Sequence, residues 1–283
     1  MNHGDFLLSQ LATRNACLVT VASTRGSVPR ATGTWMAVFA DGVIGTIGGG
    51  QLEFQAIAEA QRRLRLAGLA GGDPPITPNP VRYALGPNLG QCCGGEMVLS
   101  YQAISAADVA ALGVRLKPTL QPLALFGGGH VGRALVNVLG TLPFEVTWID
   151  SRDEIFPATV PDNVQCEHSD PVHAAVPLLE SGSAILIMSF SHAEDLDVVA
   201  ACLVRQRQRA DLPFVGLIGS QTKWATFSHR LAARGFTPAE LAHVTCPIGI
   251  SGIASKLPEA IAVSVAAQLL QAGWLAGGSG SAV

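Results

Sequence analysis

The spacing of apolar and polar positions differs between the two halves of the chain. In residues 1–116, short apolar runs typical of strands follow one another, and few stretches have the roughly 3.6-residue apolar spacing of a helix. In residues 117–276, strand-like runs alternate with helical ones, as expected for a doubly wound parallel sheet. We therefore predict an α/β protein with a smaller mixed α/β domain at 1–116, a doubly wound domain at 117–276 and a flexible tail at 277–283.

The predicted elements follow this division. For the first part they are helices at 5–14, 51–66 and 105–112, and strands at 16–22, 34–39 and 43–47, with a further apolar run at 97–101. Residues 67–80 are predicted to be a flexible connector, and residues 113–122 a linker between the domains. For the second part they are strands at 123–126, 145–149, 164–167, 184–189 and 214–218, and helices at 131–140, 172–179 and 194–209, with a last helix beginning at Pro258.

A glycine motif at the start of the second part supports a Rossmann-like fold. Residues 127–132 match G-x-G-x-x-G between a predicted strand and a predicted helix. Gly127 would permit the tight turn, Gly129 the approach of a pyrophosphate, and Gly132 close packing of the helix. Asp150, at the carboxyl end of the next strand, would accept hydrogen bonds from a ribose. These residues, with His130, are candidates for binding a dinucleotide such as NAD(P); the alternative is a scaffold whose glycines serve only packing.

Two loops of the first part have the composition of anion sites. Arg25 and Arg30 lie within a polar loop at residues 23–33, and arginine recognises phosphate or carboxylate with paired hydrogen bonds. The alternative is a solvated loop whose arginines pair with nearby acids. Three glycines between a strand and a helix form the second loop, although Glu53 can cap that helix itself. The candidate anion contacts are Arg25, Arg30, Gly48, Gly49 and Gly50.

Cys92 and Cys93 are adjacent at a glycine-rich turn. Neighbouring thiols cannot form an unstrained disulfide, and their spacing does not match a C-x-x-C site. Binding of a soft metal and persulfide chemistry remain, with Gly94 and Gly95 allowing main-chain N–H groups to close on a ligand. The alternative is a buried, inert pair. The other cysteines are expected in the core; they are Cys17, Cys166, Cys202 and Cys246.

Two further residues follow predicted strands of the second part. His192 comes after the strand at 184–189, at the sheet edge where doubly wound proteins bind ligands, and Lys223 would reach a phosphate from beyond Gly219. The alternatives are a helix-capping region for His192 and a solvated helix position for Lys223. The sequence has no hydrolase triad context, H-E-x-x-H, Walker loop or zinc cluster.

Composition narrows the function classes. Hydrophobic residues make up 48% and charged residues 14%, with a net charge of −3, so we expect a globular protein. No basic stripe with interleaved aromatics is present, which excludes nucleic acid as an expected partner. The apolar segment 260–276 contains Gln268 and Gln271 and is predicted to be a buried helix rather than a membrane span. Without a signal peptide pattern, six cysteines indicate reduced thiols and a cytoplasmic protein.

Several of these motifs together resemble the XdhC/CoxI-type family, the accessory proteins of xanthine dehydrogenase and related molybdenum hydroxylases. The resemblance is carried by residues 25–30 with Gly33 and Met36, 45–53, 91–95, 126–132 and 142–144, Gly219, Ser220 and Lys223, and 247–249 with Lys256.

The resemblance implies a chaperone without turnover. It would bind the molybdenum cofactor, protect it while a cysteine desulfurase installs its terminal sulfur, and help deliver it to the hydroxylase; a homodimer is also implied. Cys92, and Cys93 second, would contact molybdenum or its labile sulfur, while Arg25, Arg30 and the 48–50 turn would hold phosphate or pterin. An NAD(P)-dependent oxidoreductase and a purely structural assembly factor are the alternatives.

Overall fold

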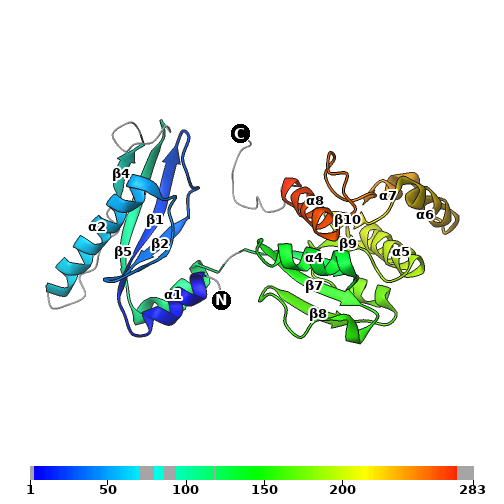
Figure 1. The fold of residues 1–283 in the computed structure, drawn as a ribbon, viewed down its shortest axis with the longest axis horizontal. Helices are drawn as coiled ribbons and strands as arrows, with labels where there is room; N and C mark the ends of the chain where they lie inside the picture. Colours follow the sequence, from blue (N-terminus) through cyan, green and yellow to red (C-terminus); the bar gives the residue numbers. More distant parts are fainter. Residues whose placement is uncertain (1–2, 70–79, 86–93, 118, 273–283) are drawn as a thin grey trace. The chain divides into compact units, whose positions relative to one another are not determined.

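The computed structural model describes residues 3–69, 80–85, 94–117 and 119–272 (Figure 1). The chain divides into two compact units, Met1–Lys117 and Pro118–Val283. Across the described residues, no helix has both the length and the apolar character needed to cross a membrane.

The N-terminal unit is built on a five-stranded sheet in the order β3-β2-β1-β5-β4. All neighbouring strands are antiparallel, and the predicted hairpin at Asp41 and Gly42 joins the second and third strands. Because β1 lies at the centre of the sheet, its carboxyl end is surrounded by the loops of the other strands. The strands are β1 (Ala16–Arg25), β2 (Trp35–Val38), β3 (Val43–Gly45), β4 (Val81–Ala84) and β5 (Glu96–Ile104).

Helices cover both faces of this sheet. α2 (Gly50–Leu69) packs on one face through Leu52, Ala56 and Ala60, which are fully buried and spaced four residues apart on one side of the helix. α1 (His3–Leu11) and α3 (Val109–Arg115), preceded by the short 3₁₀ helix η2 (Ala106–Asp108), pack on the other face. Alternate residues of β1 face the two layers, which explains why this strand reads as continuously apolar.

The C-terminal unit contains a six-stranded parallel sheet in the order β11-β10-β9-β6-β7-β8. The chain begins in the middle and winds outward in both directions, which confirms the predicted doubly wound fold. Its switch point lies between β6 and β9, where the order reverses. The strands are β6 (Gln121–Phe126), β7 (Phe144–Asp150), β8 (Val164–His168), β9 (Ala184–Ile187), β10 (Phe214–Leu217) and β11 (Val244–Thr245).

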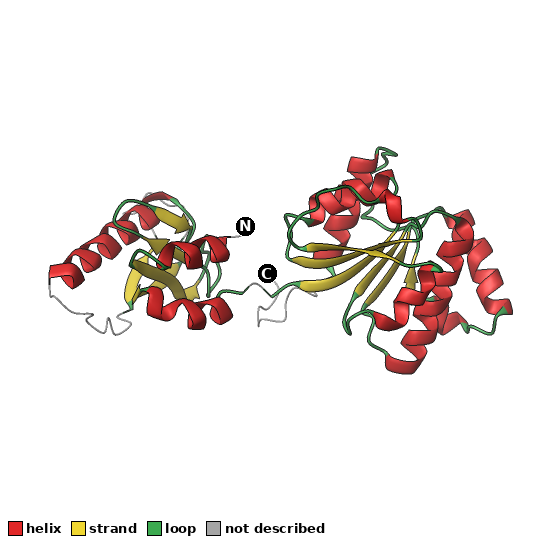
Figure 2. Ribbon diagram, turned by 90° about the horizontal axis from the view of Figure 1, so that it is seen from below, coloured by secondary structure: helices red, strands yellow, loops and turns green. Residues whose placement is uncertain are grey.

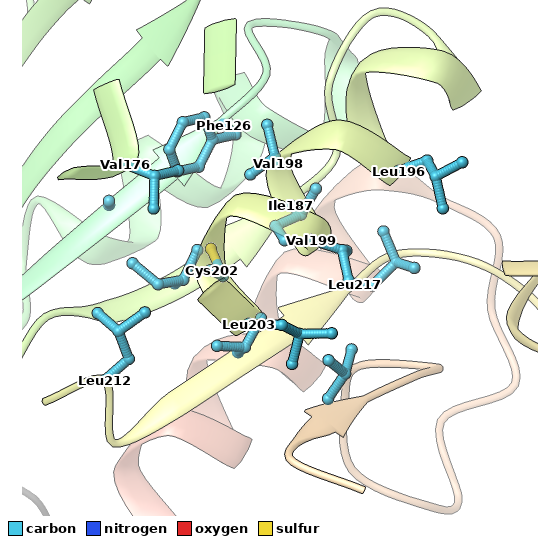
Figure 3. Close-up of a cluster of buried hydrophobic side chains, with 14 of the residues drawn as sticks. Phe126, Val176, Ile187, Leu196, Val198, Val199, Cys202, Leu203, Leu212 and Leu217 are labelled. Carbon is cyan, nitrogen blue, oxygen red and sulfur yellow. The ribbon is translucent and has the colours of Figure 1, made fainter. Parts of the chain in front are cut away.

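The helices of this unit form a layer on each side of the sheet (Figure 2). α4 (His130–Leu139) and α8 (Pro258–Gln271) lie side by side on one face, and α5 (His192–Arg209) and α6 (Gln221–Ala233) cover the other. Cys202 of α5 belongs to the same buried hydrophobic cluster as Phe126 and Val176 (Figure 3). The remaining helices are η3 (Asp153–Ile155), η4 (Val172–Leu178) and α7 (Pro238–Leu241).

Three details differ from the sequence prediction. Residues 113–115 complete α3 and β6 begins at Gln121, so the predicted linker at 113–122 is too long. The predicted helix at 172–179 is a 3₁₀ segment containing Pro177, whose ring and missing N–H do not suit an α-helix interior. No bounds were predicted for α6, α7 or β11. The predicted connector at 67–80 falls mostly on residues outside the described part of the chain.

Candidate functional site

Two of the predicted loops contact each other at one end of the N-terminal sheet. Arg25, the last residue of β1, lies opposite Glu96, the first residue of β5. A Cβ atom on Gly26 would lie 3.2 Å from the Cα of Gly95, and one on Gly95 would lie 2.2 Å from the carbonyl oxygen of Ser27. Only glycine fits at position 95. The loop after β1 therefore packs directly on the turn that precedes β5.

The glycine turn before α2 meets the same loop. A Cβ atom on Gly48 would lie 2.8 Å from ring carbons of Pro29 and 3.5 Å from Cγ of Arg30, and the backbone of Gly48 has a φ of 125° that favours glycine. The structure thus brings together residues 25–33, 46–50 and 94–95. We call this group of segments the N-terminal loop cluster.

Arg25 and Arg30 are both exposed in this cluster. Neither forms an ion pair with any residue that the structure describes. Glu96, which faces Arg25 across the strand pair, instead approaches Arg82, with Nη1 3.4 Å from Oε2. The predicted alternative, in which the two arginines pair with nearby acids, is therefore not seen among the described residues. Two exposed guanidinium groups in one loop favour an anion site.

The N–H groups of Gly48 and Gly49 in the glycine turn are hydrogen-bonded within the chain. Glu53 accepts hydrogen bonds from the N–H groups of Ile47 (2.9 Å) and Gly49 (3.0 Å) and from the hydroxyl of Thr46. Burial raises the pKa of Glu53, but these hydrogen bonds outweigh it and hold the pKa below its ordinary value. The predicted cap is confirmed. A phosphate at Gly49 would have to displace Glu53, and one at Gly48 would have to displace the hydroxyl of Thr46, so Arg25 and Arg30 are the stronger anion contacts.

Cys92 and Cys93 lie outside the described residues, and their contact with a metal stays a prediction. Gly94, which follows them, is described, and a Cβ atom added there would meet no heavy atom of the described chain within 4 Å. The pair therefore precedes a turn that packs on the loop carrying Arg25 and Arg30.

The glycine loop of the C-terminal unit has the predicted geometry. Gly127 has a φ of 121°, and a Cβ there would lie 2.0 Å from the carbonyl oxygen of Met188 at the end of β9. A Cβ on Gly132 would lie 2.1 Å from the carbonyl oxygen of Gly127, which confirms its packing role. No atom of the described residues lies within 4 Å of a Cβ on Gly129, and exposed His130 begins α4. Space for an approaching group is therefore present at Gly129, although binding of a group there stays a prediction.

The carboxylate of Asp150, which was predicted to accept hydrogen bonds from a ribose, has partners within the protein. Asp150 is 1% exposed, and its Oδ2 accepts hydrogen bonds from the N–H of Gly128 (2.6 Å) and from Nη2 of Arg152 (2.9 Å). Its Oδ1 accepts from the backbone N–H (2.9 Å) and Nε (2.8 Å) of Arg152. Burial raises the pKa of Asp150, but these hydrogen bonds and the arginine charge outweigh it and lower the pKa. A ribose hydroxyl would have to displace Arg152.

Residues 152–155 also pack against the glycine loop. Ile155 packs where a Cβ on Gly128 would lie, 2.6 Å away, and its carbonyl accepts a hydrogen bond from Nη2 of Arg133 (2.7 Å). The guanidinium of Arg152 lies 4.3 Å from the ring centre of Phe190, which follows β9 and is 66% exposed. These contacts place the side chains of Arg152 and Ile155 at the half of the sheet edge where an adenosine would lie.

Lys223 is also engaged within the protein rather than free for a phosphate. Its Nζ donates hydrogen bonds to Oδ2 of Asp195 (2.6 Å) and to the carbonyl of Ile218 (2.8 Å). Asp195 also accepts from the N–H of Ser189 (2.7 Å). His192, the first residue of α5, packs edge-to-face on Phe227. The role of Asp195 has no signal in the sequence, because an acid in the first turn of a helix is ordinarily a solvated cap.

The cysteine predictions are partly confirmed. Cys17 and Cys202 are buried, and burial raises the pKa of each to about 12. Cys166 is exposed, because β8 is an edge strand that has a partner on one side only. Cys246 is half-buried, and burial raises its pKa, while the nearby Lys223 charge lowers it. Within the described residues, no group of three or more histidines, cysteines and acids is arranged to hold a metal ion.

Similarity to known proteins agrees with this architecture. Residues 123–269 match a family described as the XdhC Rossmann domain, and residues 10–69 match the XdhC and CoxI family. The uncharacterized protein YqeB of Escherichia coli K12 is 27% identical over 256 residues, which are 90% of this chain and 43% of YqeB. The chain thus spans less than half the length of this curated relative.

A solved structure shares the whole fold. It is described as a xanthine dehydrogenase from Bacillus halodurans and superposes with a TM-score of 0.78 over 99% of this chain and 98% of that chain, at 19% identity. At that identity the likeness shows the fold alone. The family matches cover most of the C-terminal unit and about half of the N-terminal unit, and the chain belongs to the XdhC and CoxI family.

Proposed function

We propose that this protein is an accessory factor in the maturation of a molybdenum hydroxylase such as xanthine dehydrogenase. It binds the molybdenum cofactor, shields it while a cysteine desulfurase supplies the terminal sulfur, and passes it to the apo-hydroxylase. A homodimer is part of the same proposal. Membership of the XdhC and CoxI family supports this role.

The observation that carries the proposal is the N-terminal loop cluster. Arg25 and Arg30 are exposed and unpaired among the described residues, and their loop packs on the turn that directly follows Cys92 and Cys93. The cofactor is a phosphorylated pterin dithiolene that carries a soft metal. Guanidinium groups suit the phosphate, and thiolates suit the soft metal or its sulfur.

In this arrangement the chain binds, orients and shields without catalysing a reaction. Arg25 and Arg30 hold the anionic end of the cofactor, and Cys92 and Cys93 hold the metal end. Glu53 keeps the neighbouring turn rigid by accepting its N–H groups. When bound, the cofactor supplies the metal centre that the hydroxylase later uses.

The NAD(P)-dependent oxidoreductase is the weaker candidate. Space at Gly129 favours it, but Arg152 occupies both oxygens of Asp150 and Ile155 covers Gly128. Nucleotide binding would therefore need residues 152–155 to move. The proposed chaperone function needs no such movement.

The proposal is tested by measuring cofactor retention. Protein purified from cells that make the cofactor is ultrafiltered and analysed for molybdenum and pterin, with Cys92→Ala, Cys93→Ala and, as control, Cys166→Ala at the exposed cysteine of β8. We expect retention by wild type and C166A, loss in C92A or C93A, and activation of apo-hydroxylase only by protein that retains cofactor. Folded wild type without cofactor would refute the chaperone. Retention of the cofactor by both cysteine variants would refute the thiol site. Cofactor binding by the chaperone would then depend on Arg25 and Arg30.

A further inference from the structure

A cavity lies at the carboxyl edge of the second half of the parallel sheet, away from the closed glycine loop. It has a volume of about 530 Å³ and is bounded by Ile218 and Gly219 after β10, by residues 247–255 after β11, and by Ile261 and Ser264 of α8. This is the sheet edge at which doubly wound proteins bind ligands, and the volume falls in the range of roughly 300–1,000 Å³ typical of small-molecule sites. The lining segment runs between β11 and α8, orange to red in Figure 1.

Among the described residues, no ionisable side chain lines this cavity. Its apolar wall is made mainly of isoleucines, including Ile218, Ile248 and Ile261, and its polar groups are serine hydroxyls and glycine backbone. Lys223 packs on Gly219 through its carbon chain, but its ammonium group is bound by Asp195 and by the carbonyl of Ile218. Such a lining suits an uncharged, flat ligand with a few hydrogen-bonding groups.

The start of the lining segment is held on α8. The N–H of Gly249 donates to Oε1 of Gln268 (2.7 Å), and a Cβ on Gly249 would lie 2.5 Å from Oγ of Ser264. The N–H of Ile250 donates to the carbonyl of Ser264 (3.3 Å), and the hydroxyl of Ser264 donates to the carbonyl of Ile250 (3.3 Å). This part of the cavity wall is therefore fixed before a ligand binds, which lowers the ordering cost of binding.

Beyond Ile250, the lining segment has backbone donors without a partner among the described residues. The N–H groups of Ser251, Gly252 and Ala254 make no hydrogen bond with any part of the chain that the structure describes. Backbone N–H donors beside backbone carbonyl acceptors match a ligand edge that carries a carbonyl next to an N–H. Lactams and carboxamides have that edge, and the isoleucine wall would cover the face of their ring.

The geometry points to this cavity as a binding site for a planar, uncharged heterocycle with a lactam or carboxamide edge. Purine-type and pterin-type rings share this chemistry. Arg152 binds Asp150 and Ile155 packs against Gly128 at the adenosine half of the edge, so we assign to the cavity a single ring system rather than a whole dinucleotide. The inference stands on the C-terminal unit alone and does not depend on the cysteines or arginines of the N-terminal loop cluster.

Calorimetric titration of the full chain with hypoxanthine, xanthopterin and adenine tests this site. Adenine has the shape of hypoxanthine without the lactam carbonyl, so we expect it to bind about tenfold more weakly, the effect of losing one hydrogen bond. Ala254→Trp and Ile253→Trp place a large ring in the cavity at exposed positions, and Val263→Trp adds the same ring on the exposed side of α8 that does not line the cavity. Circular dichroism checks the fold of each variant.

We expect binding of a lactam ring to weaken about tenfold or more in A254W and I253W and to stay within about twofold in V263W. Binding of hypoxanthine alone or of xanthopterin alone supports the site and identifies the ring class. Three results would overturn it: no binding of either ring at millimolar concentration, unchanged binding in both cavity variants, or adenine binding as tightly as hypoxanthine. Cofactor retention by the same preparations is scored separately, so failure of this site leaves the chaperone proposal untouched.

Discussion

Removing the Arg152 side chain should strongly affect the stability of the C-terminal unit. Arg152→Ala deletes two charge-assisted hydrogen bonds to Asp150, of 2.8 and 2.9 Å, and leaves a carboxylate that is 1% exposed with only backbone N–H donors. Breaking a fully buried pair costs about 3–5 kcal/mol. Because the Arg152 side chain is 35% exposed, water can partly replace it, and we expect a loss of about 2 kcal/mol in the free energy of unfolding.

Urea unfolding followed by tryptophan fluorescence measures this loss. A Trp35→Phe background removes the tryptophan of β2, so that the signal comes only from tryptophans of the C-terminal unit, including Trp148 and Trp224. Asp150→Asn alone and combined with R152A completes a double-mutant cycle, in which we expect a coupling of about 1 kcal/mol or more. A change below about 0.5 kcal/mol in R152A would refute the account of Asp150, since surface substitutions cause changes of that size.

The pH dependence gives the same prediction a second readout. The folded-state pKa of Asp150 lies below its ordinary value of 3.8, so its stabilising contribution is fully present above that pH and is lost as pH falls through the lower folded-state pKa. The difference in unfolding free energy between wild type and R152A should therefore shrink as the pH is lowered below 3.8. A difference that stays constant would contradict the assignment to Asp150.

Three further substitutions test other parts of the structure. Gly95→Ala should destabilise the N-terminal unit by about 2 kcal/mol or more in thermal unfolding, since its Cβ would overlap backbone, whereas Gly94→Ala should change stability by less than about 0.5 kcal/mol; equal effects would refute the close loop contact. Lys223→Met leaves the Asp195 carboxylate buried without its cation and should cost about 3–5 kcal/mol in urea unfolding, with partial recovery in the double variant that also carries Asp195→Asn. Glu53→Ala removes the acceptor of the glycine turn and should cost about 1 kcal/mol, measured by thermal unfolding; no change would show that the turn does not need this cap.

The fold could be predicted because, in each unit, apolar positions recur at the spacing of strands or helices. Strand-like runs such as 123–126 and 145–149 alternate with helical stretches. The glycine motif at 127–132 indicates which strand begins the doubly wound sheet. Gly127 and Gly132 have packing roles, and these could be predicted because a short local motif specifies them. α6 could not be anticipated in this way because its apolar face depends on Phe227 and Leu231 meeting a core formed by distant segments.

The site residues were harder to predict, because whether a side chain is free to bind a ligand depends on the groups that it contacts within the protein. Asp150 and Lys223 stand at the expected sheet edge, yet Arg152 and Asp195 hold them inside the protein. Arg152 is only two residues from Asp150, but a sequence does not reveal that its side chain turns back onto the carboxylate. Conversely, the proximity of Gly26 and Gly95 follows from the pairing of β1 with β5, which joins segments about seventy residues apart.

Cofactor binding by arginine variants of the N-terminal loop cluster tests the central claim most directly. The double variant Arg25→Gln with Arg30→Gln is compared with Arg65→Gln, which removes an exposed charge at the far end of α2, and molybdenum and pterin are measured in the retained protein. We predict that R65Q retains wild-type amounts and that the double variant binds about tenfold or more weakly, since two charge-assisted contacts are lost. Equal retention by the double variant and wild type would contradict the claim that this cluster holds the cofactor.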